Sequence, residues 1–438
     1  MQKTSSFLSR SPFAGFRRLC YAFGILSSTL LYVSHPYVAY AETAEEEEAE
    51  DEQPALTPEV GKVLEAAQAA LEEKNATLAL DEVTKASKMP NTNAFDNYMI
   101  QRIRAAACTQ KEEIGCALSA YDSLLGNPQT QPDEKKRMLS AIAALAYRAQ
   151  DYQKCEKTAL NYLEHESYDP VMASLAVQCP YVAQNWAETV RASKSLSVLS
   201  QKYKKPVSEA SLQMLAVAYG NLGKAEEERE TYTVLAETYP NPRYWEFLLH
   251  EFMSDTKMPQ RLRFNVMRLR LATGAGKLEP KEFQDMAERA VQMEVPSLAV
   301  KFLQIGYDKK ILGQGTLQQS EEEQRFKTFI QQQAYKAHRG LNQAIVQARK
   351  SSSAGALLSA GYELALEGHA AAGLSVMREG MENHPNYPEI AELEYAMAEL
   401  DVGQKSAAIR HLENISGNGP AHALGQLWVK ELQSQGRK

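Results

Sequence analysis

Residues 208–240 read SEASLQMLAVAYGNLGKAEEERETYTVLAETYP, and this stretch decides the fold. Its first half places large and small apolar residues on one face of a helix, namely Leu212, Leu215, Ala216 and Tyr219. The turn Asn-Leu-Gly-Lys follows at 221–224. Tyr232 and Leu235 then face inward from a second helix, which Pro240 ends. The stretch therefore predicts two antiparallel helices joined by a short turn.

This pattern resembles the tetratricopeptide repeat, a helical hairpin of 34 residues. Two such helices approach closely only where small residues meet, and large residues fill the space around them. In the second helix of each hairpin, one position faces the first helix and usually holds a small residue; we call it the small position. The residues at this position recur at similar intervals: Ala79, Ala117, Cys155, Thr189, Glu228, Arg261, Ala299, Gly373 and Ala408. The resemblance implies an all-α fold, a tetratricopeptide-repeat α-solenoid of antiparallel helical hairpins. Glu228 and Arg261 are too large for this position, so their hairpins are expected to splay or to turn these side chains outward.

The chain divides into five parts. Residues 1–41 have a basic start, an apolar run and the cleavage signal Ala39-Tyr40-Ala41, as in a secretory signal peptide. An uncleaved anchor is the alternative, but the apolar run is shorter than the roughly 20 residues that a spanning helix needs. The remaining parts are an acidic disordered segment at 42–56, an N-terminal repeat array at 57–311, a long bridging helix at 312–350, and C-terminal repeats with a capping helix at 351–438.

The charge of the chain limits its partners. The formal net charge is -7, which disfavours nucleic acid because phosphate binding needs a basic surface. Like charges in the acidic segment repel one another and keep it unfolded. The segment either docks on a basic partner or is a solvated spacer, and we favour the spacer.

Four cysteines remain after removal of the leader: Cys108, Cys116, Cys155 and Cys179. They form either disulfides, as the even number in an exported chain suggests, or buried free thiols. Antiparallel helices bring Cys108 opposite Cys116 within the second hairpin, and Cys155 opposite Cys179 between the third and fourth. We therefore predict the pairs 108–116 and 155–179. Without Cys-x-x-Cys or nearby histidine ligands, no metal site is expected.

No motif for catalysis or cofactor binding is convincing. The stretch 272–277 suggests a phosphate-binding loop, but its leading glycine and its Ser or Thr are missing. The arginines at 261, 263, 268 and 270 form either an anion-binding or lipid-headgroup patch or, as we favour, a packed helix whose arginines pair with Glu246, Glu251 and Asp255. The sequence thus predicts a protein that catalyses no reaction and holds no cofactor.

The first helices of a repeat array line a groove, and the register of the motif places ten residues there. They are Gln68, Arg137, Tyr147, Arg148, Gln178, Tyr181, Gln213, Asn221, Arg243 and His250. Tyrosine and arginine are enriched in binding hot spots. These residues either bind an extended peptide or a partner helix, or they form a solvent-exposed surface with no binding role. We favour binding. The partner is then a protein or peptide, and the oligomeric state stays open.

The order of parts also resembles a group of exported proteobacterial repeat proteins, some of which are associated with TonB–ExbB–ExbD complexes. Besides the leader and the repeats, this resemblance rests on Tyr244-Trp245, the stretch 268–274 and the long polar helix. The resemblance implies a periplasmic scaffold that assembles or steadies an envelope complex and contacts membranes only through it. The alternatives are a structural protein of the outer membrane or cell wall, and an enzyme whose site the repeats conceal.

The leader predicts where the mature chain begins. Because Ala39-Tyr40-Ala41 fits the signal peptidase, Glu42 should be the first residue of the protein isolated from its native cells. Mass spectrometry of the intact protein measures this directly. A chain that still begins at Met1 and stays in the inner membrane would contradict the leader assignment.

Overall fold

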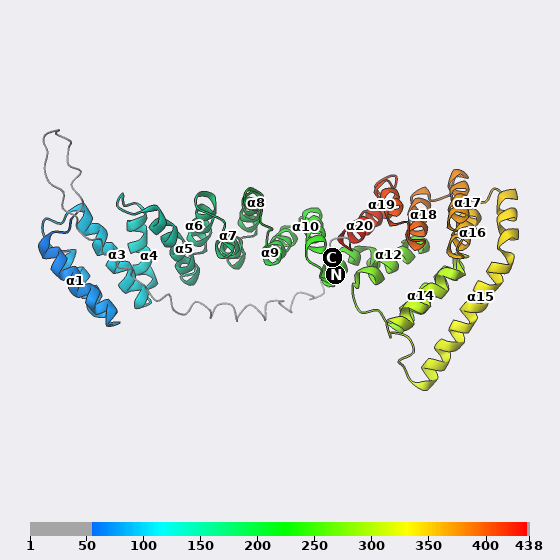
Figure 1. Cartoon of the computed structure of the whole chain (residues 1–438), viewed down its shortest axis with the longest axis horizontal. Coiled ribbons are helices and arrows are strands. Elements are labelled where there is room, and N and C mark those ends of the chain that lie inside the picture. The colour runs from blue at the N-terminus through cyan, green and yellow to red at the C-terminus, as the bar shows by residue number, and fades with distance from the viewer. Residues whose placement is uncertain (1–54, 436–438) are drawn as a thin grey trace, which may run out of the picture. The chain divides into compact units, whose positions relative to one another are not determined.

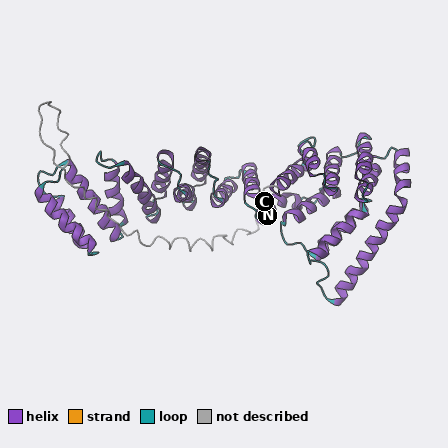
Figure 2. Cartoon of the chain, in the orientation of Figure 1, coloured by secondary structure: helices purple, strands orange, loops and turns teal. Residues whose placement is uncertain are grey.

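A computed structural model describes residues 55–435. The signal peptide at 1–41 and nearly all of the acidic segment lie outside this range. The described chain forms twenty α-helices, without a β-strand in this range (Figure 2). The predicted all-α fold class is therefore confirmed.

The first ten helices form five antiparallel hairpins, which follow one another in chain order (Figure 1). These are α1 (Pro58–Glu72) with α2 (Ala76–Ala86), α3 (Ala94–Gln110) with α4 (Ile114–Leu125), α5 (Pro132–Arg148) with α6 (Tyr152–His165), α7 (Pro170–Val182) with α8 (Trp186–Tyr203), and α9 (Glu209–Asn221) with α10 (Ala225–Thr238). Ala79, Ala117 and Cys155 are wholly buried where paired helices meet. Small side chains at these places let the helices approach closely.

Glu228 shows how a large residue fits at a position that is small in other hairpins. A Cβ atom added at Gly220 would lie 2.8 Å from Glu228 Oε1, so the missing side chain of this glycine leaves room for the carboxylate. Burial raises the pKa of Glu228. Helices α9 and α10 pack against each other as the helices of the other hairpins do. The expected splay is therefore not needed, because the carboxylate fits into the space beside Gly220.

The chain continues through α11 (Pro242–Ser254), α12 (Gln260–Thr273), α13 (Pro280–Gln292) and α14 (Pro296–Asp308) to the long helix α15 (Leu317–Lys350). Thr316 caps α15 in a capping box with Gln319. Ile330, Leu341 and Ile345 are buried on its apolar stripe. The predicted long helix is thus one unbroken element, which ends at the serines that follow Lys350.

Five helices complete the chain: α16 (Ala354–Leu366), α17 (Ala370–Glu382), α18 (Pro388–Asp401), α19 (Lys405–Glu413) and α20 (Pro420–Ser434). Helices α16 and α17 approach most closely at two glycines. A Cβ atom on Gly361 would lie 2.7 Å from the carbonyl oxygen of Gly373, so neither position accepts a side chain without a shift of the helices.

The C-terminal hairpins pack back on the preceding helices. The repeat spacing predicts two blocks in series, joined by the long helix. In the structure α20 contacts α10 and α12, and α16 contacts α14 (Figure 1). One apolar core contains Trp245 together with Leu393 and Trp428, and a second contains Phe302 together with Tyr395. The two blocks therefore share their interior.

A buried cluster of charged side chains lies beside the apolar core that contains Phe302 and Tyr395. Arg268 of α12 donates to both carboxylate oxygens of Asp401, each at 2.9 Å, and to the Tyr362 hydroxyl at 2.9 Å. Lys301 Nζ lies 2.8 Å from the same carboxylate. Burial opposes ionisation of Asp401, but Arg268 and Lys301 outweigh it and lower the pKa of the carboxyl. Four helices, α12, α14, α16 and α18, thus meet at one buried carboxylate that two cations share.

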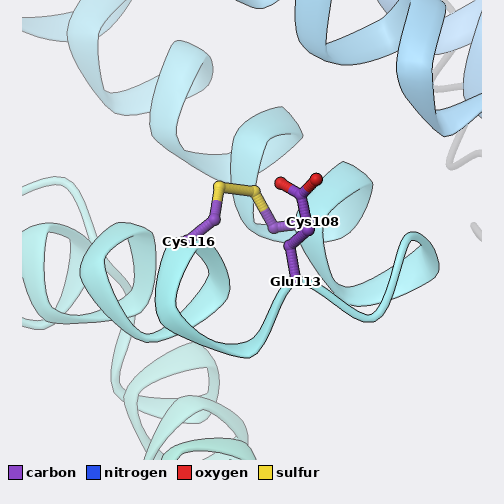
Figure 3. A group of neighbouring side chains, drawn as sticks. All are labelled: Cys108, Glu113 and Cys116. Carbon is purple, nitrogen blue, oxygen red and sulfur yellow. A yellow bond between two sulfur atoms is a disulfide. The ribbon is translucent and has the colours of Figure 1, made fainter.

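Both predicted disulfides are present in the structure. Cys108 of α3 is bonded to Cys116 of α4 across one turn, with their Cα atoms 5.7 Å apart (Figure 3). Cys155 of α6 is bonded to Cys179 of α7, with their Cα atoms 6.2 Å apart. The first bond closes a hairpin and the second joins two successive hairpins.

The ion cluster yields a stability prediction. Asp401→Ala leaves the Arg268 charge buried with its main counter-ion gone, which costs about 3–5 kcal/mol. Chemical denaturation should show this loss in the free energy of unfolding, while Glu288→Ala, at an exposed site of α13, should stay within about 0.5 kcal/mol of wild type.

The pH dependence supplies a second readout for Asp401. Because the folded-state pKa is lowered, the stabilisation by Asp401 is present above its unfolded-state pKa and is lost as pH falls through the folded-state pKa. Asp401→Ala should therefore lose stability less steeply on acidification. A variant with wild-type stability at neutral pH would show that the cluster does not hold these helices.

The disulfides yield a prediction about connectivity. Non-reducing peptide mapping should find 108–116 and 155–179, and replacing both Cys155 and Cys179 by Ala should lower the free energy of unfolding by roughly 3 kcal/mol. Four free thiols, or a crossed pairing, would overturn both the bonds and the repeat register from which they were predicted.

Candidate protein-interaction surfaces

Hydrogen bonds join neighbouring first helices at three places. The Tyr98 hydroxyl of α3 donates to Glu134 of α5 at 2.6 Å. Gln178 of α7 donates to the Tyr147 hydroxyl of α5 at 3.1 Å, and Gln213 of α9 donates to the Tyr244 hydroxyl of α11 at 2.6 Å. Three of the predicted groove residues, Tyr147, Gln178 and Gln213, are therefore half-buried in contacts within the array.

The hydroxyl of Tyr244 has two partners. It accepts from Gln213 and donates to the Glu209 carboxylate. Burial and the hydrogen bond to Glu209 raise the pKa of Tyr244 to about 12. The hydroxyl therefore keeps its proton at any physiological pH and holds α11 against α9.

Six further groove residues are exposed on first helices: Gln68, Arg137, Arg148, Asn221, Arg243 and His250. Arg148 is 55% exposed and lies 4.0 Å from Glu112. The Asn221 side chain donates to the carbonyl oxygen of Val217. Ion pairs with this exposure contribute little stability. These side chains can meet a partner without a large loss of intramolecular contacts.

Tyr181, the tenth groove residue, belongs to a group of ring contacts that we call the aromatic strip: Tyr181, Trp186, Tyr232, Tyr244 and Phe247. Tyr181 meets Trp186 edge to face with ring centroids 5.7 Å apart, and Tyr232 stacks on Phe247 at 3.8 Å and tilts against Tyr244 at 6.2 Å. Burial, Glu228 and Tyr181 together raise the pKa of Tyr232. The strip thus consists of two sets of ring contacts, one on α7 and α8 and one on α10 and α11.

The repeat register places only Tyr181 of this strip in the groove. Trp186 and Phe247 were not predicted there, because one begins a second helix and the other lies at a position that the motif leaves variable. Phe247 is 38% exposed. The number of aromatic residues between α7 and α11 was the one feature of the sequence that could have predicted this cluster.

A cleft of about 630 Å³ is lined by residues of α8, α9 and α10 and of the loop that follows α8. Leu212 and Leu215 of α9 lie at its base, and the buried Ser200 hydroxyl has no partner within the described chain. Lysines 204 and 205 line one side, and glutamates 227 and 230 the other. Val234 on its wall is 43% exposed, and Val198 nearby on α8 is 67% exposed.

The arginine-rich helix α12 is packed and paired, but not with the predicted acids. Arg261 pairs with Glu394 at 2.7 Å, Arg268 with Asp401, and Arg270 with Glu282. Arg263 donates to the backbone oxygen of Asp255. Glu246 instead accepts from the Gly276 backbone, and Glu251 pairs with Arg229. The predicted partners were wrong because these arginines reach residues up to 133 positions away in the chain.

One group of potential metal ligands occurs within the described residues, formed by Cys108, Glu113 and Cys116, whose ligand atoms lie within 4.8 Å of one another (Figure 3). Both sulfur atoms are consumed in the disulfide. A disulfide offers no thiolate, which is the form of cysteine that binds metals.

Comparisons with known proteins do not identify a family. No family model matches the chain, and no curated protein matches it. Among solved structures, it is similar to Naa15/Naa10 bound to HypK-THB, with 10% identity, coverage of 86% of this chain and 73% of that chain, and a TM-score of 0.23. It is also similar to yeast Tom70, with 9% identity, coverage of 86% and 96%, and a TM-score of 0.24. The tetratricopeptide-repeat domain of P58(IPK) is also similar, with 13% identity, coverage of 87% of this chain and 99% of that chain, and a TM-score of 0.20.

At such low identities and TM-scores these structures add nothing to the fold or the surface, which rest on the helices and contacts described above. In the part of the chain that the structure covers, no helix is long and apolar enough to cross a membrane.

Proposed function

We propose that the chain is a protein-binding scaffold that contacts its partner through the face formed by α5, α7, α9 and α11. The aromatic strip is the observation that carries this proposal, because its half-buried Tyr181 and its exposed Phe247 lie on α7 and α11, in the same series of helices as the exposed Arg148 and Arg243. Tyrosine and arginine contribute most to binding when a partner excludes water from them. An extended peptide or a partner helix is the ligand that suits such a face.

We further propose that the protein acts in the periplasm, where it assembles or steadies an envelope complex, including one of the TonB type. The predicted leader supports export, and the two disulfides are compatible with an oxidising compartment. We further propose that it acts by binding and catalyses no reaction.

The second candidate is a structural protein of the outer membrane or cell wall, held through several weak contacts. The cleft lined by α8, α9 and α10 supports this alternative, because Val234 of the second helix α10 is exposed on its wall. Val234→Glu would place a charge in the cleft without changing Arg148 or Tyr181.

Crosslinking in intact cells tests the proposed face. A photo-reactive residue at position 181 should capture one defined protein, and the same residue at Tyr335, 64% exposed on α15, should not. Arg148→Ala with Tyr181→Ala should lower the crosslinking yield at a third site on the same face, position 243. The double change should cost no more than about 2 kcal/mol of stability, because Arg148 is exposed and Tyr181 only half-buried.

The matched control is Arg325→Ala with Tyr335→Ala, which removes an arginine and a tyrosine from α15. Retained crosslinking in the Arg148/Tyr181 variant, with loss in Val234→Glu, would move the binding site to the cleft and contradict the first-helix assignment. Sedimentation of the wild-type protein with isolated cell walls, without a protein adduct, would favour the structural role instead.

A further inference from the structure

The cleft lined by α8, α9 and α10 has an apolar middle and two charged ends. Leu212 and Leu215 of α9 form its base, and Val234 of α10 is exposed on its wall. An exposed aliphatic side chain beside an apolar base gains free energy when a partner removes both from water. The middle of the cleft therefore favours an apolar surface on the partner.

One end of the cleft is basic. The Tyr239 hydroxyl, directly after α10, donates to the carbonyl oxygen of Val207 at 2.6 Å, so α10 ends beside the loop that follows α8. Lys204 and Lys205 line the cleft from that loop. Both lysines are exposed, and neither ammonium group has an ion pair or a hydrogen bond within residues 55–435. Their charges are available to a partner.

The opposite end of the cleft is acidic. Glu228 lies beside Gly220, so α10 begins next to the end of α9. Near this start of α10, Glu227 and Glu230 line the cleft together with Tyr219 of α9. Burial raises the pKa of Tyr219, and the charges of the two glutamates raise it further. The lysines and the glutamates thus lie at opposite ends of α10.

The shape of the cleft suits a helix better than an extended peptide. Its lining residues on α10 run from Glu227 to Thr238, which is about 16 Å or three helical turns. An extended peptide would press backbone N–H and C=O groups against the apolar base, whereas a helix satisfies these groups internally. Apolar side chains at i, i+3, i+4 and i+7 of a helix can enter such a groove together.

The charged ends restrict the helix further. Glutamates at one end of the cleft repel an acidic helix, and lysines at the other end repel a basic helix. A helix of one sign therefore suits only one end, whereas a helix with a basic end and an acidic end suits both.

We propose that this cleft docks an amphipathic helix of a partner protein, with aliphatic residues on one face, a basic end beside Glu227 and Glu230, and an acidic end beside Lys204 and Lys205. The inference goes beyond the proposed function. None of the lining residues belongs to the aromatic strip or to the predicted groove, so either proposal can fail without the other.

Fluorescence anisotropy with a designed peptide tests the cleft in the protein isolated from its native cells. The probe is a labelled peptide of about four helical turns, with leucines at i, i+3, i+4 and i+7, lysines in its first turn and glutamates in its last. Charges in this order destabilise the free helix, so a gain of helicity in circular dichroism reports docking. A peptide of the same composition whose lysines and glutamates alternate should bind at least about tenfold more weakly.

The first variant tests the apolar wall. Val234→Glu places a charge in the middle of the cleft and should weaken peptide binding at least about tenfold. Its matched control is Val346→Glu, at a valine of α15 that is 50% exposed, and this variant should bind the peptide as the wild type does.

The second variant tests the basic end. Lys204→Ala with Lys205→Ala should weaken peptide binding about tenfold. The matched control is Lys309→Ala with Lys310→Ala, which should bind normally. These two lysines are also exposed and also follow a helix, and Lys310 has a positive φ as Lys204 does. Both variants lose the same charge and carry the same backbone strain, so a difference between them reports the cleft.

Three results would overturn the proposal: no binding of the probe peptide, undiminished binding in Val234→Glu, or loss of binding in the Arg148/Tyr181 variant. The last would place the peptide on the first-helix face. Sedimentation with isolated cell walls that Val234→Glu abolishes, without any binding of the peptide, would assign the cleft to a wall polymer instead.

Discussion

The bond between Arg268 and Asp401 is the interaction on which the second half of the molecule depends. It joins α12 to α18 across 133 residues of chain, with Tyr362 and Lys301 completing the cluster. Placing two charges in an apolar interior costs several kcal/mol per ion before their attraction is counted. Such a pair contributes less to net stability than to the choice of one arrangement, because any other packing leaves a charge buried alone.

This constraint determines the course of the chain around it. Because α18 must lie against α12, the chain after α14 has to return, and the unbroken helix α15 makes that return before α16 packs on α14. Arg261, two turns before Arg268 on α12, is then brought to Glu394 on α18. The pair Arg261–Glu394 is therefore a consequence of the same packing, while the ring contacts of the aromatic strip join helices that are near one another along the chain.

Local packing could be predicted from the sequence, and distant packing could not. Alanines such as Ala79 and Ala117 are buried where two successive helices meet. Such contacts join residues close together in the sequence, so the hairpins could be predicted from it. The same register led to both disulfides, since each bond joins helices that are adjacent along the chain. The splay expected at Glu228 does not follow, because Gly220 on the facing helix leaves room for the larger side chain.

The failures share one physical cause. Partners for the arginines of α12 were sought nearby in the sequence, but they come from α13 and α18 as well as from the local backbone. No periodic pattern encodes which distant carboxylate meets which guanidinium. Six residues of the predicted groove are exposed on first helices, whereas Tyr147, Gln178 and Gln213 make hydrogen bonds within the array.

Native-state hydrogen exchange with increasing denaturant measures most directly whether the two blocks form one cooperative unit. If the shared cores and the ion cluster join them, the slowest amides of α12 and α18 should open with the same free energy and the same dependence on denaturant. Exchange of α18 through a separate opening of lower free energy, with α12 still protected, would contradict this account.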